Sequence, residues 1–262
     1  MKHSKKSLGQ NFLIDHNIKR KIISSVKVIG KNVLEIGPGK GFLTDEILKN
    51  KPRFLTLIEK DNFMAKELKN RYKNNENVRV YNKDILKFDI EKKIKKNTLV
   101  YGNLPYNISS QILVKFLKFK EWPPNFSNLI FMFQKEMSER IVGKFNSNDY
   151  GRLSILTNFR LNIIKRFHVS PNCFLPRPKV DSTVICFEPK KDISYNIKNI
   201  SNLEKITNAL FSNKRKMINK SFKKIFKDYD KLKFIKDLDL TKRPSEISPN
   251  TYYEITELYE RS

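Results

Sequence analysis

The chain has 262 residues, of which 39% are hydrophobic, so it can bury the core of one large domain or of a domain with a smaller one attached. Its formal net charge of +26 is unusual for an enzyme of small metabolites and indicates a polyanionic partner, either nucleic acid or an anionic membrane surface. Two cysteines exclude a disulfide framework, and no apolar run approaches the roughly 20 residues that span a bilayer.

The first residues give no sign of export. Met1–Lys6 is basic but no apolar segment follows it, which is unlike a secretory signal. Cys173 and Cys186 fit a reducing cytoplasm, and the three histidines are scattered without the spacing of metal ligands. We therefore expect a cytoplasmic protein without a metal site.

A basic arm over residues 1–15 leads to a helix predicted at about Asp15–Val28. The strand-like run Asn32–Ile36 is then followed by the glycine-rich turn Gly37–Gly41 and a helix from about Thr44. Such a unit opens nucleotide-binding sheets. This turn lacks the Lys-Ser/Thr of phosphate-binding loops, so it favours a cofactor without a polyphosphate.

Acidic residues follow the next two predicted strands. Glu59 lies 22 positions after Gly37, close to the offset at which an acid accepts hydrogen bonds from ribose hydroxyls. Asp84 follows the third strand and can accept from the amino group of an adenine. The alternative is that acids here cap helices, as Asp61 is placed to do. Together the strand ends predict a site for an adenosine.

A fourth strand-like run, Thr98–Tyr101, leads to Asn103–Tyr106 and then to a helix-like segment, Ser109–Phe119. The Asn carbonyl and a neighbouring backbone carbonyl can accept hydrogen bonds from an exocyclic amine. The Tyr ring can lie against a flat base while Pro105 fixes the backbone between them. The alternative is an ordinary Asn-x-Pro turn.

The remaining strands close the predicted sheet. Leu129–Phe133 is typical of a buried central strand, and Asn162–Val169 with Val180–Glu188 is predicted to form a terminal strand pair after a helix at Arg152–Thr157. Phe174 lies in a proline-rich loop between the last two strands. It either fills the core or faces Tyr106 across the target base.

Helical periodicity replaces the strand pattern from about Asp192. Ile218 and Phe222 share the apolar side of one predicted helix. Four lysines share its opposite side: Lys216, Lys220, Lys223 and Lys227. Because no acid interrupts this row, we interpret it as a contact for RNA phosphates, although a solvated helix face is the alternative.

The strand-end pattern resembles that of S-adenosylmethionine-dependent methyltransferases, and Asn-Leu-Pro-Tyr resembles the subset that methylates the exocyclic amine of adenine. Motifs in order narrow the resemblance to the small-subunit ribosomal RNA adenine dimethyltransferases of the KsgA/RsmA type: Gln10–Leu13, Glu35–Gly39, Gly102–Ser109, Gln134–Glu136, Tyr150–Ser154 and Pro178–Ser182. The stretches Phe211–Met217 and Arg243–Glu246 resemble that family's C-terminal domain.

The resemblance implies a Rossmann-like α/β methyltransferase sheet of seven strands, with an antiparallel last pair, over residues 1–190, and a small helical domain that binds RNA and the ribosome over residues 191–262. It places these residues around S-adenosylmethionine: Asn11, Leu13, Gly37, Gly39, Glu59, Asp84 and Asn103. It places these at the target base: Asn103, Leu104, Pro105, Tyr106 and Phe174. We expect RNA contacts at Lys214, Arg215, Lys216, Lys220, Lys223 and Lys227.

The implied activity is that of a 16S rRNA (adenine-N6,N6)-dimethyltransferase, a monomer that modifies two adjacent adenines in a hairpin near the 3′ end of small-subunit RNA on immature subunits. One alternative is a 23S rRNA adenine methyltransferase of the macrolide-resistance type, which shares this type of loop. Another is an assembly factor that no longer catalyses. Pro178–Ser182 and Arg243–Glu246 favour the small-subunit class, and Leu104 disfavours DNA adenine methyltransferases, many of which carry Pro there.

Overall fold

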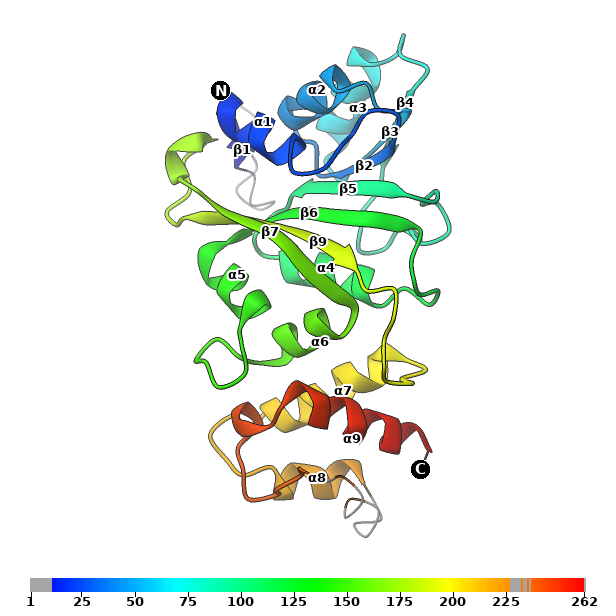
Figure 1. Ribbon diagram of the computed structural model, residues 1–262. Helices are drawn as coiled ribbons and strands as arrows, with labels where there is room; N and C mark the ends of the chain where they lie inside the picture. Colours follow the sequence, from blue (N-terminus) through cyan, green and yellow to red (C-terminus); the bar gives the residue numbers. More distant parts are fainter. Residues whose placement is uncertain (1–10, 227–231, 233–234, 236, 262) are drawn as a thin grey trace. The chain divides into compact units, whose positions relative to one another are not determined.

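The computed structural model describes residues 11–226, 232, 235 and 237–261 (Figure 1). The chain divides into two compact units, which are described separately. The first, here called the sheet unit, comprises the residues up to Lys115 with Glu121–Ser138 and Asn162–Pro189. The second, the helical unit, comprises Phe116–Lys120, Glu139–Leu161 and the residues from Lys190 onward. The functional division expected at residue 190 stays a prediction.

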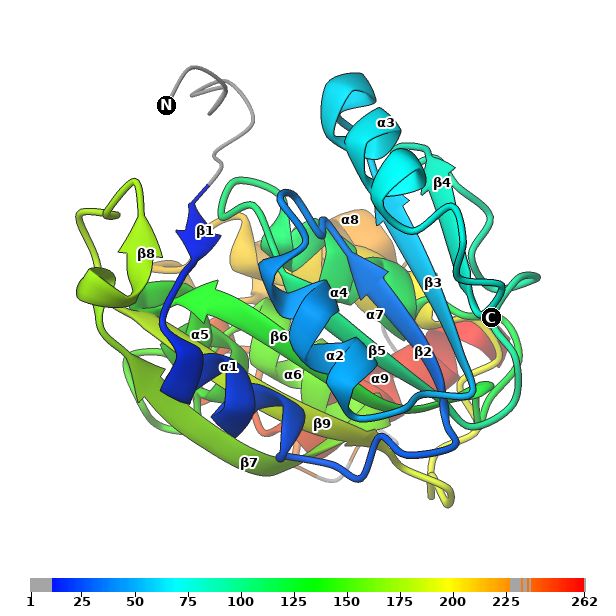
Figure 2. The same cartoon turned by 90° about the horizontal axis from the view of Figure 1, so that it is seen from above.

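The sheet unit is built on a seven-stranded sheet with the order β4-β3-β2-β5-β6-β9-β7 (Figure 2). The first five of these strands run parallel to their neighbours, while β9 is antiparallel to β6. The predicted mixed seven-stranded sheet is therefore confirmed. Its strands are β2 (Asn32–Ile36), β3 (Phe54–Glu59), β4 (Val78–Asn82), β5 (Thr98–Asn103), β6 (Phe126–Gln134), β7 (Leu161–Val169) and β9 (Ser182–Pro189).

Helices cover both faces of this sheet. One face carries α1 (His16–Ile23), α2 (Phe42–Lys49) and α3 (Asn62–Arg71), and the other carries α4 (Ser109–Leu117) (Figures 1 and 2). The division between the units passes through the end of α4 and through α5 (Lys135–Val142).

Carboxylates cap two of these helices, as their sequence positions suggest. The Asp15 carboxylate accepts a hydrogen bond from Ile18 N at 2.8 Å and starts α1, which ends at Ile23, earlier than predicted. Asp61 accepts from the backbone N–H groups of Phe63 and Met64 and starts α3.

A second, two-stranded sheet joins segments far apart in the sequence. β1 (Phe12–Leu13) pairs antiparallel with β8 (Phe174–Leu175), which follows the short helix η2 (Pro171–Cys173). Ile14 N extends the pairing by donating to Cys173 O at 2.8 Å. Phe12–Leu13, within the segment expected to be a basic arm, therefore forms a strand, which the sequence did not indicate.

The parallel pairing places four strand ends side by side. Ile36 pairs with Ile58 of β3 and with Gly102 of β5, and Glu59 pairs with Asn82 of β4. Parallel strands in register bring their carboxyl ends to one edge. The glycine turn, both acids and the Asn103 loop therefore meet at this edge.

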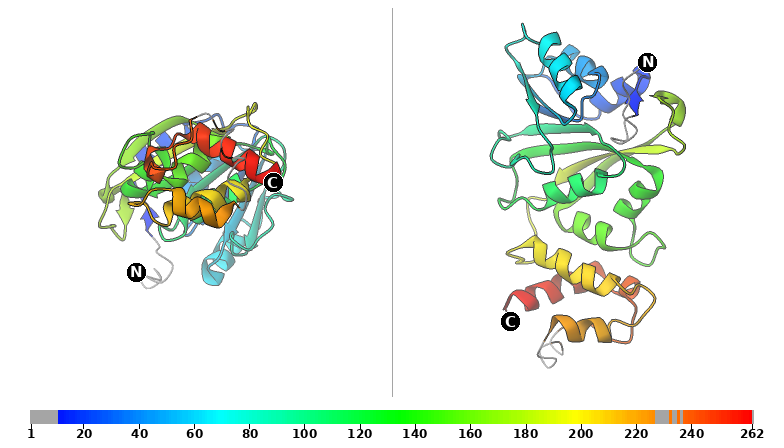
Figure 3. Two further views of the ribbon diagram at one scale, coloured as in Figure 1. Left: turned by 90° about the horizontal axis from the view of Figure 1, so that it is seen from below. Right: turned by 180° about the vertical axis from the view of Figure 1, so that it is seen from behind.

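The helical unit consists mainly of α6 (Arg152–Arg160), α7 (Ile200–Phe211), α8 (Asn219–Ile225) and α9 (Pro249–Arg261). In the right-hand view of Figure 3, α7 (yellow) lies beside α9 (red) and α8 (orange), in agreement with their mutual contacts. Phe211 stacks on Tyr252 with ring centroids 5.8 Å apart, and the Tyr150 hydroxyl donates to Ile247 O at 2.9 Å. Aromatic side chains thus provide much of this unit's interior.

The predicted basic helix is shorter than expected. α8 begins only at Asn219, because Ile218 N donates to Lys242 O instead of continuing a helix backward to Lys216. Ile218 and Phe222 are buried as predicted. The described basic residues of the segment are exposed, and Lys227 lies outside the described residues: Lys214, Arg215, Lys216, Lys220 and Lys223.

Within the part of the chain that the structure describes, no helix has both the length and the apolar character to cross a membrane. The same residues contain no group of three or more His, Cys, Asp or Glu side chains arranged to hold a metal ion.

Candidate active site

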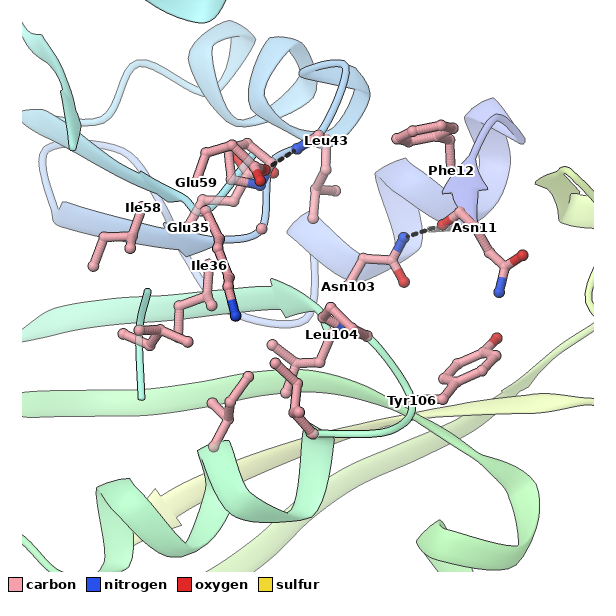
Figure 4. Close-up of a pocket in the computed structure, with 18 of the residues that line it drawn as sticks. Asn11, Phe12, Glu35, Ile36, Leu43, Ile58, Glu59, Asn103, Leu104 and Tyr106 are labelled. Carbon is pink, nitrogen blue, oxygen red and sulfur yellow. Dashed lines mark hydrogen bonds between the residues drawn. The ribbon is translucent and has the colours of Figure 1, made fainter. Parts of the chain in front are cut away.

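A cavity of about 180 Å³ opens at the carboxyl edge of the sheet (Figure 4). Strands β2, β3 and β5, the residues after β4, strand β1 and the start of α4 all contribute to its wall. It brings together nearly all residues that the sequence assigned to cofactor and target base: Asn11, Leu13, Gly37, Gly39, Glu59, Asp84, Asn103, Leu104, Pro105 and Tyr106. Phe174 is absent from the described lining.

The glycine turn allows the backbone to form one side of this cavity. Gly37 and Gly39 have φ values of +66° and +56°, which L-residues with side chains rarely adopt. A Cβ atom on Gly39 would lie 2.8 Å from Cε1 of Phe12, whereas real Cβ contacts are longer. Gly39 therefore permits both the turn and the close packing of Phe12 against it.

The far end of the turn is fixed by α3. The Arg71 guanidinium donates to Lys40 O at 3.0 Å and pairs with the Asp45 carboxylate. The Tyr72 hydroxyl donates to the other Asp45 oxygen at 2.7 Å. These contacts join the start of α2 to the end of α3 and so fix the position of the residues that follow the turn.

Glu59 is oriented by the backbone of its surroundings. Its Oε2 accepts from Gly39 N at 3.0 Å, the upper dashed line in Figure 4, and its Oε1 accepts from Asp61 N at 2.8 Å. The side chain is 6% exposed. Burial raises its pKa, while the N–H groups of Asp61 and Gly39 act in the opposite direction. Each oxygen keeps a further lone pair that can accept from a ligand hydroxyl.

Asp84 stands beside Glu59 but has a different environment. Its Oδ1 accepts from Leu86 N at 2.9 Å and its Oδ2 lies 2.9 Å from Lys60 Nζ. The bond from Lys60 lowers the pKa of Asp84. A ligand amine that approaches Asp84 therefore meets an ionised acceptor that also binds the exposed Lys60.

Glu35 is a buried carboxyl that the sequence did not assign to the site. It accepts from the Thr44 hydroxyl at 2.7 Å and is 1% exposed at the cavity wall. Burial raises its pKa to about 8. The sequence contained a signal for it, since Glu35 interrupts the otherwise apolar strand Val33–Ile36.

Asn103 is the last residue of β5, and its amide has a defined orientation. Nδ2 donates to the backbone carbonyl of Asn11 at 2.9 Å, the lower dashed line in Figure 4. Because only the NH₂ group of an amide can donate to a carbonyl, the opposite atom, Oδ1, is left as the acceptor. The segment preceding β1 thus determines which end of the Asn103 amide is available to a ligand.

Leu104 and Pro105 shape the loop that follows. Leu104 is 2% exposed, and a Cβ atom on Gly102 would lie 2.4 Å from its Cδ2. Gly102 therefore leaves the space in which the Leu104 side chain packs. Ile108 N donates to Pro105 O at 3.1 Å and closes the turn into α4.

Tyr106 lines the cavity, as Asn103 does (Figure 4). Its hydroxyl lies 2.7 Å from the Ser182 hydroxyl at the start of β9. Burial raises the pKa of Tyr106, so the phenol stays protonated at neutral pH. The ring is half-buried, which leaves part of it open to a ligand.

Phe174 does not line this cavity, and its expected position opposite Tyr106 across the target base stays a prediction. Phe174 is 3% exposed and belongs to the hydrophobic core with its strand partner Leu13. Successive residues of a strand point to opposite sides, so Phe174 points inward while Leu175 is 46% exposed. Core filling, the alternative drawn from the sequence, describes its position in this structure.

Comparison with known proteins adds independent evidence. The model of the family described as ribosomal RNA adenine dimethylase matches residues 1–261. Ribosomal RNA small subunit methyltransferase A of Pelagibacter ubique (strain HTCC1062) is 42% identical over 257 residues, which cover 98% of this chain and 97% of that protein.

Two solved structures share the fold over nearly the whole chain. A dimethyladenosine transferase from Plasmodium falciparum has a TM-score of 0.73 at 26% identity and covers 94% of this chain and 95% of its own. The 23S rRNA methyltransferase ErmE has a TM-score of 0.67 at 22% identity, with 96% and 99% covered. These structures show the fold, and the sequence match over the full length decides the family. The chain belongs to the ribosomal RNA adenine dimethylase family.

Proposed function

We propose that this protein transfers methyl groups from S-adenosylmethionine to the exocyclic amines of two adjacent adenines in small-subunit (16S) ribosomal RNA, in a hairpin near its 3′ end. The observation that carries the proposal is the Asn103 amide. Its NH₂ group is bound to Asn11 O, so Oδ1 is presented as an acceptor at the cavity. An amino group is the ligand group that such an acceptor selects.

The cavity suits the proposed cofactor. Glu59 and Asp84 are acceptors that can bind ribose hydroxyls and an adenine amine, while Ile36, Ile58 and Ile85 offer apolar walls to a purine. Gly39 brings the backbone close, and Phe12 fills the space where a Cβ atom would stand. When bound, S-adenosylmethionine supplies an electrophilic methyl group on a sulfonium.

The residues of the loop then orient the nucleophile. The amine lone pair of adenine is delocalised into its ring, so hydrogen bonds from the NH₂ group to Asn103 Oδ1 and to the Leu104 carbonyl favour a pyramidal nitrogen. Tyr106 lies against the base and offsets part of the cost of removing it from its stack. No strong base is required, because the alkylated amine is acidic enough to release its proton to water. Catalysis is then mostly positioning, worth several kcal/mol.

The helical unit supplies the basic surface in this proposal. Its exposed cations contact RNA phosphates and position the substrate without reading bases: Lys214, Arg215, Lys216, Lys220 and Lys223. We propose that residues 191–262 form an RNA-binding and ribosome-binding domain, that the protein acts as a cytoplasmic monomer on immature small subunits, and that it takes part in their biogenesis.

Mass spectrometry of digested ribosomal RNA, from cells with and without this protein, tests the proposal directly. N6,N6-dimethyladenosine should disappear from small-subunit RNA when the protein is absent. Primer extension on both ribosomal RNAs separates the alternatives. If the primer-extension stops at modified adenines vanish from large-subunit RNA alone when the protein is absent, the protein is a 23S rRNA methyltransferase. If the modification is unchanged and the protein still binds the subunit, it is an assembly factor without catalysis.

A further inference from the structure

Ser182, the first residue of β9, lies 76 positions from Tyr106 in the sequence, and its side chain meets that of Tyr106. Its hydroxyl is 2.7 Å from the Tyr106 hydroxyl, and the residue is fully buried. We propose that Ser182 is a positioning residue that fixes the plane of the Tyr106 ring against the target base. The inference rests on the proposed function, in which Tyr106 stacks on an adenine.

The backbone of Ser182 is suited to act as an anchor. Ser182 pairs with Gln134 in the ladder between β9 and the central strand β6. Immediately before it, the Asp181 carbonyl accepts from Lys135 N at 2.9 Å. A hydroxyl on this backbone has little freedom to move, because both the ladder and the bond next to it would have to break.

Tyr106 needs such an anchor because its backbone and its side chain are held by different contacts. The Ser109 hydroxyl donates to Tyr106 O at 3.1 Å and Ile108 N donates to Pro105 O, so the turn fixes the main chain. These bonds leave the two side-chain torsions of Tyr106 free. The bond to Ser182 holds the Tyr106 hydroxyl oxygen in place, which restrains χ1. Because the phenol O–H lies in the plane of its ring, the direction of the same bond also favours one value of χ2.

The restraint matters because two contacts must hold the same base. Asn103 Oδ1 binds the amine from one direction while the Tyr106 ring supports the face of the purine. A tilted ring would shift the amine relative to the methyl donor, and displacements on the order of 1 Å can cost about 10²-fold in rate. Loss of the Ser182 hydroxyl should therefore reduce kcat while cofactor affinity, which depends on other residues, is kept.

The experiment is a double-mutant cycle with Ser182→Ala, Tyr106→Phe and the combination, assayed for methyl transfer to undermethylated small subunits. Each single variant should lower kcat roughly tenfold, and the double variant should be no slower than the slower single variant, because each removes the same bond. Ser182→Thr keeps a hydroxyl and should restore kcat. Calorimetric affinity for S-adenosylmethionine should stay within about twofold of wild type in all four variants.

Ser138→Ala is the matched control. Ser138 is also fully buried, and its hydroxyl donates to Lys135 O at 2.7 Å, so the variant loses a comparable bond away from the cavity. It should lower the melting temperature about as much as Ser182→Ala and leave kcat unchanged.

Several results would overturn the inference. Wild-type kcat in either single variant, additive losses in the double variant, or an equal loss in Ser138→Ala would each assign Ser182 a structural role only. If Ser182→Ala fails to fold, Tyr106→Phe alone still tests the bond, and wild-type kcat there refutes it. Failure of the proposed function looks different, since the wild-type protein itself would then transfer no methyl group to small subunits.

Discussion

The strand-end cavity of the sheet unit and the basic segment Lys214–Lys223 of the helical unit carry their charges in opposite environments. Glu59 is 6% exposed and both of its oxygens accept backbone hydrogen bonds. The described cations of the basic segment are exposed, and no acid occurs between Asn213 and Phe226. The first environment fixes atoms in place, as bond-making requires. The second suits phosphate contacts that tolerate sliding and carry no sequence information.

Asn103→Ala should give the largest effect, because it removes an acceptor used in the transition state. We expect kcat for methyl transfer to fall on the order of 10²-fold or more while the affinity for small subunits stays near wild type. Single-turnover assays with separate binding measurements check this. The control is Asn50→Ala, since the Asn50 amide also donates to a carbonyl, Glu46 O at 2.9 Å, but caps α2 outside the cavity. Near-wild-type turnover in Asn103→Ala would refute the assigned role.

Gly39→Ala should weaken cofactor binding and leave the basic segment unaffected. Its φ of +56° costs roughly 1–2 kcal/mol with a side chain, and its Cβ would displace Phe12. Gly30→Ala is a matched control with φ of +70° and nothing within 4 Å of the added Cβ. Both variants should lose the stability that the positive φ costs, and Gly39→Ala should lose more because it also displaces Phe12. Only Gly39→Ala should lose cofactor affinity, by about tenfold or 1.4 kcal/mol. Equal affinities by calorimetry would contradict the packing argument.

Neutralising the basic segment should change binding without changing chemistry. In the triple variant Lys216→Gln, Lys220→Gln and Lys223→Gln, the plot of log affinity for small subunits against log salt should become shallower, by up to about one unit per lost phosphate contact. At saturating substrate, kcat should be kept. Neutralising three exposed lysines of the sheet unit provides the control: Lys66, Lys69 and Lys73. An identical slope in both triple variants would mean that the segment is only solvated.

The smallest effect on function concerns Glu35. Its pKa rises from 4.5 to about 8 on burial. The folded state thus binds the proton more tightly than the unfolded state, so this carboxyl favours folding below about pH 4.5, and its contribution declines as pH rises toward about 8. Glu35→Gln stays neutral and can still accept from Thr44, so it should gain stability over wild type across that window, by at most about 1.4 kcal/mol per pH unit. Urea unfolding without cofactor at several pH values measures the free energy of unfolding of both proteins. A difference between wild type and Glu35→Gln that does not change with pH would contradict the prediction.

The same comparison explains what the sequence could predict. The sequence predicted the cavity residues because parallel strands bring their carboxyl ends to one edge of the sheet. It was enough to recognise the residues that follow successive strands: Gly37, Glu59, Asp84 and Asn103. The sequence left open whether Phe174 fills the core. Which side of a two-residue strand faces inward depends on its partner strand β1, in which the paired residue, Leu13, lies 161 positions away.

The predicted start of the basic helix was wrong for a related reason. Helical periodicity placed Lys216 on the same helix as Lys220, but the bond from Ile218 N to Lys242 O starts α8 later. Local patterns cannot anticipate a long-range hydrogen bond that replaces a helical one. The Ser182 contact with Tyr106 has the same character, since it joins two motifs whose spacing in sequence is unrelated to their distance in space.

The bond between the Asn103 amide and Asn11 O has a practical consequence for anyone who shortens this protein. Asn11 lies 92 positions away from Asn103 and outside the seven-stranded sheet. A fragment that starts after Leu13 would keep every strand of that sheet, together with the glycine turn and both acids. The Asn103 amide of such a fragment would nevertheless be free to flip, so the fragment would keep the sheet and lose the fixed acceptor.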